Sequence, residues 1–193
     1  AAALTIFPAP NTPYTEALTH FARAIGAARS GKPEAAAADI ARLGELRDRL
    51  QAMADPYWAE QVDIQRRVAL ARLTFAAGRR DEGIAQLGAA ADAEDATDKA
   101  AVTPGPLAPA RELFGDMLLE AGRATEALAA FEATMKKEPN RFRGAYGAAR
   151  AAEAAGDRGK AKTYYNQLLQ IARDADTARP ELPWTVINSN GWL

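Results

Sequence analysis

Apolar residues in this chain recur at intervals of three and four, the spacing of residues on one face of an α-helix. Between residues 56 and 78, such a face is formed by Ile64, Val68, Ala71 and Phe75. No window alternates apolar and polar residues in the way that a half-buried strand would. The pattern therefore predicts an all-α protein.

Start and stop signals divide this pattern into separate helices. Asp55 followed by Pro56 is a good N-cap followed by proline at the first helical position. Pro139 predicts the end of another helix, and Asn140 is suited to capping the helix that follows. Residues 93–109 hold several prolines and predict a surface connection, with Pro109 beginning the next helix.

Two segments repeat the same arrangement of small and aromatic residues. EAGRATEALAAF and AAGDRGKAKTYY share three positions: Gly122 and Gly156, Ala127 and Ala161, and Phe131 and Tyr165. Each pair differs by 34 (156 − 122, 161 − 127, 165 − 131). The glycines predict a turn with positive φ, the alanines a close approach of two helices, and the aromatic residues fill the space beside it.

Two earlier segments keep this register more loosely. AAGRRDEGIAQL places Gly78, Gly83 and Leu87 at the three positions, and ARSGKPEAAAADI places Gly31, Ala36 and Ile40 there. Their separations are longer, 47 (78 − 31) and 44 (122 − 78), so the first two units must house extra residues. Longer helices and the connection at residues 93–109 account for these residues.

These segments resemble tetratricopeptide repeats, whose period is about 34 residues. Residues 94–118 are also similar to a segment of uncharacterised bacterial proteins of this family. The resemblance implies a right-handed superhelical α-solenoid of about four helix-turn-helix pairs. The units would span residues 13–54, 56–99, 108–140 and 141–175 of a repeat domain at 13–178, between an irregular lead-in at 1–12 and a tail at 179–193.

Family resemblance also implies a concave groove, lined by the first helix of each unit, that receives a peptide or a partner segment. The groove positions in the last three units are Gln65, Val68, Arg72 and Phe75; Glu112, Asp116 and Leu119; and Arg143, Tyr146, Arg150 and Glu153. The arginines can hold a carboxylate of a ligand in a bidentate manner. Alternatively, they pair with Glu112, Asp116 and Glu153 across neighbouring helices.

In the first unit the groove positions are apolar, namely Leu18, Phe21 and Ile25. An exposed apolar stripe of this size is unusual on a soluble monomer. The lead-in, the tail, a second copy of the chain, upstream repeats or a ligand would cover it. This surface favours an alternative function, assembly through self-association or docking to upstream repeats.

Composition and charge exclude several function classes. The net charge is −1 with acidic and basic residues interspersed, which does not favour nucleic acid as a partner. No apolar run is long enough to predict membrane insertion. The chain has no cysteine, so disulfides and thiolate metal sites are excluded. It begins with alanine, which we interpret as a mature product or an excised fragment, in either the cytoplasm or the periplasm.

No catalytic motif is found, and we predict a scaffold rather than an enzyme, with no cofactor and no metal. The chain lacks phosphate-binding glycine motifs, G-x-S-x-G and H-E-x-x-H. His20 is the only histidine, and we expect it to pack partly buried near the first helix. The acidic cluster at residues 92–98 lacks the glycine at the sixth position and the glutamate at the twelfth position of a calcium-binding loop.

Overall fold

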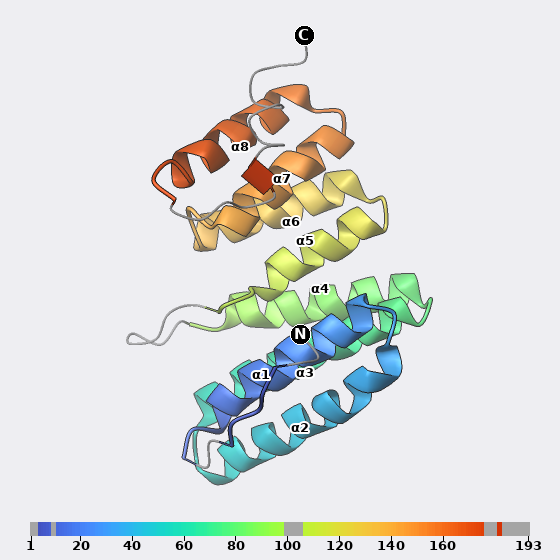
Figure 1. Cartoon of the computed structure of the whole chain (residues 1–193), viewed down its shortest axis with the longest axis vertical. Helices are drawn as coiled ribbons and strands as arrows, with labels where there is room; N and C mark the ends of the chain where they lie inside the picture. Colours follow the sequence, from blue (N-terminus) through green and yellow to red (C-terminus); the bar gives the residue numbers. More distant parts are fainter. Residues whose placement is uncertain (1–3, 9–10, 99–105, 176–180, 183–193) are drawn as a thin grey trace. The chain divides into compact units, whose positions relative to one another are not determined.

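The computed structural model describes residues 4–8, 11–98, 106–175 and 181–182, which form eight α-helices and no strand. The chain divides into two compact units, unit 1 (Ala1–Asp98) and unit 2 (Lys99–Leu193). Unit 1 contains α1 (Pro13–Arg29), α2 (Ala36–Ala52), α3 (Pro56–Ala76) and α4 (Arg80–Ala96), with a 3₁₀ turn at Pro33–Ala35. Unit 2 contains α5 (Ala110–Glu120), α6 (Ala124–Lys137), α7 (Phe142–Ala154) and α8 (Arg158–Ile171). The all-α prediction is confirmed, and Figure 1 shows consecutive helices in antiparallel pairs.

The same type of turn connects the two helices in each of the four helix pairs. Gly31, Gly78, Gly122 and Gly156 have φ values of +72°, +89°, +78° and +80°, in the left-handed region that favours glycine. In each turn the residue after the glycine donates its backbone N–H to the carbonyl five residues earlier, as Arg123 does to Leu118 at 2.9 Å. The predicted positive φ is therefore confirmed at Gly122 and Gly156, and the two looser segments use the same geometry.

Capping residues were predicted correctly at one helix and wrongly at another. The Asp55 carboxylate accepts a hydrogen bond from the backbone N–H of Trp58 at 3.2 Å and caps α3 as expected. Asn140 does not cap α7, because its φ of +61° places it in the preceding turn and Arg141 occupies the N-cap position. Pro109 is the N-cap of α5, one residue before the helix begins.

Unit 1 buries a network of charged side chains between α1 and α2. His20, Glu16 and Asp39 are 7%, 6% and 5% exposed, so the expected packing of His20 is confirmed. His20 Nδ1 lies 2.7 Å from Asp39 Oδ1, and its Nε2 lies 3.6 Å from Glu16 Oε1. Arg23 Nε lies 3.1 Å from Asp39, and Arg42 lies 2.8 Å from Glu16. Each buried carboxylate therefore has an arginine partner.

Unit 2 is packed around one aromatic ring. Phe131, on α6, is 1% exposed and lies between a glycine of α5 and a glycine of α7. A Cβ added to Gly115 would lie 2.8 Å from the ring, and one added to Gly147 would lie 2.3 Å from it. Since Cβ atoms essentially never approach another heavy atom within 3.0 Å, only glycine fits at either position without a shift of the ring. This close packing holds α7 against α5 and α6.

Candidate peptide-binding surface

Four of the predicted groove residues lie on one side of α7. Arg143, Tyr146, Arg150 and Glu153 follow one another at spacings of three, four and three, which places them on a common face, here called the α7 face. The two arginines are exposed, whereas Tyr146 and Glu153 are half-buried. α7 packs against α5, which contributes the half-buried Asp116 and Leu119.

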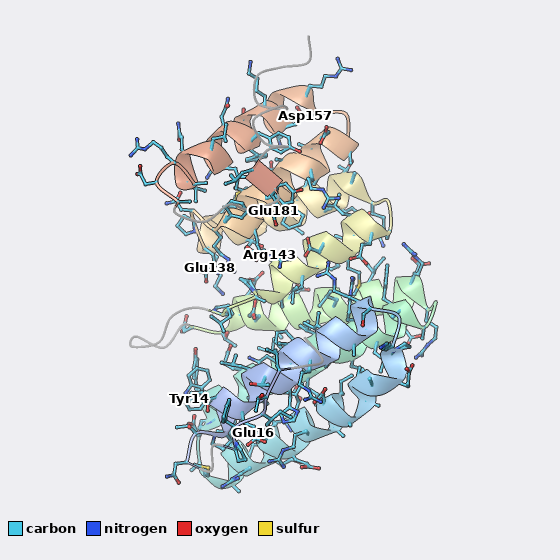
Figure 2. All side chains as sticks on the ribbon, in the orientation of Figure 1. Tyr14, Glu16, Glu138, Arg143, Asp157 and Glu181 are labelled. Carbon is cyan, nitrogen blue, oxygen red and sulfur yellow. The ribbon has the colours of Figure 1, made fainter. Side chains whose placement is uncertain are left out.

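Arg143, labelled in Figure 2, lies at the first turn of α7. It forms an ion pair with Asp116 of α5. The distance from Nη2 to Oδ2 is 2.7 Å, and the side chains are 55% and 23% exposed. The predicted alternative of pairing across neighbouring helices therefore holds for this arginine. Its charge is already matched by a carboxylate of the same unit.

Arg150 is in a different situation. Its guanidinium carbon lies over the Tyr146 ring, 5.7 Å from the ring centroid. Within the part of the chain that the structure describes, it forms no hydrogen bond and no ion pair. The stacking orients the guanidinium while its N–H groups stay available to a ligand.

Glu153 is held by the second helix of its own pair. Its Oε2 accepts a hydrogen bond from the hydroxyl of Tyr165, on α8, at 2.9 Å. It forms no ion pair with Arg150, although the two residues are three positions apart. Glu153 therefore adds a negative charge to the α7 face without neutralising Arg150.

Glu112 requires a correction, because it is 2% exposed and cannot line an open groove. Its carboxylate accepts two hydrogen bonds from Arg141, from Nε at 2.8 Å and from Nη2 at 3.2 Å. Arg141 also donates to the carbonyl of Leu107 at 3.0 Å and so ties the start of α7 to the start of α5. No sequence pattern pointed to Arg141, because it precedes the helix and lies outside the repeat positions.

The groove residues predicted on α3 were also wrong, because three of them are buried. Val68, Arg72 and Phe75 are 2%, 8% and 8% exposed, so they offer little surface to a ligand. The Phe75 ring lies 5.6 Å from the guanidinium carbon of Arg72 and 4.5 Å from that of Arg80. Through these cation–π contacts, the Phe75 ring binds arginines of its own α3–α4 pair.

The apolar surface expected on α1 is smaller than predicted. Phe21 is 8% exposed, while Leu18 and Ile25 are half-buried. Of the candidate covering segments, the lead-in contributes little through Phe7, which is 75% exposed. The tail residues Trp184, Ile187 and Trp192 lie outside the described residues. The burial of Phe21 removes the centre of the stripe that favoured self-association.

A second polar cluster joins α6 to α8. Glu132 accepts hydrogen bonds from Lys160 Nζ at 2.8 Å and from the Tyr164 hydroxyl at 2.6 Å. The bond from Lys160 and then that from Tyr164 lower the pKa of Glu132. Burial, followed by the hydrogen bond to Glu132, raises the pKa of Tyr164 to about 12. These groups tie α8, of the last helix pair, to α6 of the preceding pair.

Among the described residues, no three His, Cys, Asp or Glu side chains are grouped so as to hold a metal ion. None of the helices in this part of the chain combines the length and apolar character needed to cross a bilayer.

Comparison with known proteins identifies the repeat. A family model described as tetratricopeptide repeat matches residues 118–179, a segment that includes α6, α7 and α8. A search of curated proteins found no match. The α7 face lies within the matched segment, and its helix pairs have the turn geometry described above. Residues 118–179 of this chain therefore match the tetratricopeptide-repeat family.

Proposed function

We propose that this chain is a protein-interaction scaffold and that the α7 face binds a peptide or a segment of a partner protein. Tetratricopeptide repeats are in general protein–protein interaction modules, which supports the broad class. The observation that carries the specific proposal is Arg150, an exposed guanidinium that is stacked on Tyr146 and has no ion-pair partner among the described residues.

The contact between these two residues favours binding for two reasons. Arginine and tyrosine are among the residues that contribute most to protein interfaces, because each combines apolar area with hydrogen-bond donors. Holding the guanidinium over the ring also reduces the side-chain entropy that binding would otherwise remove. The α7 face therefore offers an oriented donor next to an aromatic surface.

The test is a selection of binding peptides from a displayed random library, followed by affinity measurement by fluorescence polarisation. We expect Arg150→Ala to weaken binding of the selected peptides by about tenfold or more, since a charge-assisted hydrogen bond contributes about 1.5–3 kcal/mol. Tyr146→Ala should also weaken binding, because it removes the ring over which Arg150 lies. Arg143→Ala should have a smaller effect, because Asp116 already binds this arginine.

A matched control is Arg173→Ala, which removes an arginine that is 80% exposed and lies beyond the end of α8. This variant should bind as the wild type does. Unchanged affinity in both the Arg143 and the Arg150 variants would show that the peptides bind elsewhere. Failure to select any peptide would contradict the scaffold function itself.

A further inference from the structure

The α7 face and its surroundings carry two positive and two negative side chains, but within the described residues only three of the four form an ion pair or hydrogen bond with a neighbouring side chain. Arg143 and Arg150 supply two positive charges, and Asp116 and Glu153 supply two negative ones. Asp116 is bound to Arg143, and Glu153 accepts from Tyr165. Arg150 is the member of this group without an ion pair or hydrogen bond to a described residue. One guanidinium is thus open to a ligand, although the four charges named here sum to zero.

Asp116 occupies the position that a second ligand carboxylate would need. Its Oδ2 lies 2.7 Å from Nη2 of Arg143, and its side chain is 23% exposed. Because the Arg143 side chain is 55% exposed, this ion pair contributes at most about 1 kcal/mol to stability. The Asp116 charge does repel an acidic group that approaches Arg143, an effect that weakens with salt.

We propose that Asp116 sets the charge specificity of this surface, so that the α7 face prefers a segment with a single carboxylate to a strongly acidic one. The ligand carboxylate pairs with Arg150, and an apolar or planar neighbouring group lies against Tyr146. A second or third acidic residue gains nothing, because Arg143 is already neutralised and because Asp116 and Glu153 repel it. This inference rests on the proposed peptide-binding function.

The experiment uses an array of amidated eight-residue peptides with no, one or three glutamates in otherwise identical apolar and polar sequences. The labelled full chain is applied at low and at high salt. We expect the wild-type chain to bind the one-glutamate peptides more strongly than the glutamate-free ones, and to bind the three-glutamate peptides no more strongly than the one-glutamate ones.

Asp116→Asn should improve binding of the three-glutamate peptides about fivefold at low salt, the equivalent of about 1 kcal/mol. Arg150→Gln should remove the dependence on glutamate.

A charge-matched control is Glu126→Gln, which removes one negative charge from unit 2 at an exposed residue that pairs with Arg123. It should leave the preference unchanged. Equal effects of Asp116→Asn and Glu126→Gln would overturn the inference, because the preference would then reflect net charge. A wild-type preference for three glutamates would also overturn it while leaving the scaffold function intact, whereas absence of binding to every peptide would contradict both.

Discussion

The two units of this chain stabilise their helix pairs by different means. In unit 1, α1 and α2 enclose His20 between Glu16 and Asp39, each of these carboxylates having an arginine partner. In unit 2, α6 inserts the Phe131 ring between glycines of α5 and α7. Small residues around one aromatic ring belong to the part of the chain with the regular 34-residue period. The His20 network belongs to the part in which that period is lost, whereas unit 2 buries, among its described residues, a single carboxylate, Glu112, against Arg141.

The difference shows which contacts a repeat pattern specifies. A ring between glycines depends on residue size at fixed positions, which a repeat pattern can specify. A buried charge network depends on a particular set of partners, and removing one partner leaves the others buried and unmatched. Mutations should therefore lower the stability of the two units through different mechanisms.

The largest effect is expected in unit 2, from Gly147→Ala. The new Cβ would lie 2.3 Å from Cε1 and 2.4 Å from Cζ of Phe131, and Gly115 prevents the ring from moving to the other side. We expect the free energy of unfolding to fall by about 3 kcal/mol, the upper end for overpacking a core. This loss of stability is measured by urea unfolding, monitored by circular dichroism.

The control for this change is Gly44→Ala, within α2, where an added Cβ would meet only Arg66 Cδ at 3.7 Å. This variant should gain about 0.5–1 kcal/mol through helix propensity. A Gly147→Ala protein as stable as wild type would refute the role given to the Phe131 ring.

A somewhat smaller effect is expected in unit 1, from Asp39→Asn. The amide keeps the shape of the carboxylate but removes the charge that His20 and Arg23 face. We expect a loss of about 2 kcal/mol in the free energy of unfolding, as for other hydrogen bonds to charged groups. Asp48→Asn, on the same helix but 62% exposed, should change it by less than about 0.5 kcal/mol. Similar losses in the two variants would show that burial of the network is unimportant.

The smallest effect concerns pH and the α6–α8 cluster. The pKa of Tyr164 is raised to about 12, so its contribution is complete below pH 10 and is lost as the pH rises from 10 towards 12. Tyr164→Phe should be less stable than wild type at pH 8 by at most about 1 kcal/mol, because the hydroxyl is partly exposed to solvent. The difference should shrink by pH 11, as measured by urea unfolding at both values. A constant difference would contradict the role of this hydroxyl.

Local features of the fold were accessible from the sequence. The turn glycines Gly122 and Gly156 and the N-cap Asp55 depend on nearby residues only, and the structure confirms them. Asn140 was assigned wrongly because its type suits both a cap and a left-handed turn, and the backbone adopts the turn.

Contacts between distant residues were not accessible in the same way. Asp39 lies 19 residues from His20, and Arg141 lies 29 residues from Glu112. Neither pair follows the repeat spacing, and many other carboxylates were equally plausible partners. For the same reason, the repeat register taken from the family resemblance placed Glu112, Arg72 and Phe75 in a groove although all three are buried. It did place Arg143, Tyr146 and Arg150 on one helix face, and their use in binding stays a prediction.

The most direct test of the central claim is a titration of the isotope-labelled chain with a selected peptide, followed by the backbone amide signals in NMR. We predict that the largest shifts fall on Arg143–Glu153 of α7 and on the neighbouring turns of α5, and that they vanish in Arg150→Ala. Saturable shifts confined to α8 or to unit 1, and unchanged in that variant, would show that the α7 face is not the binding surface.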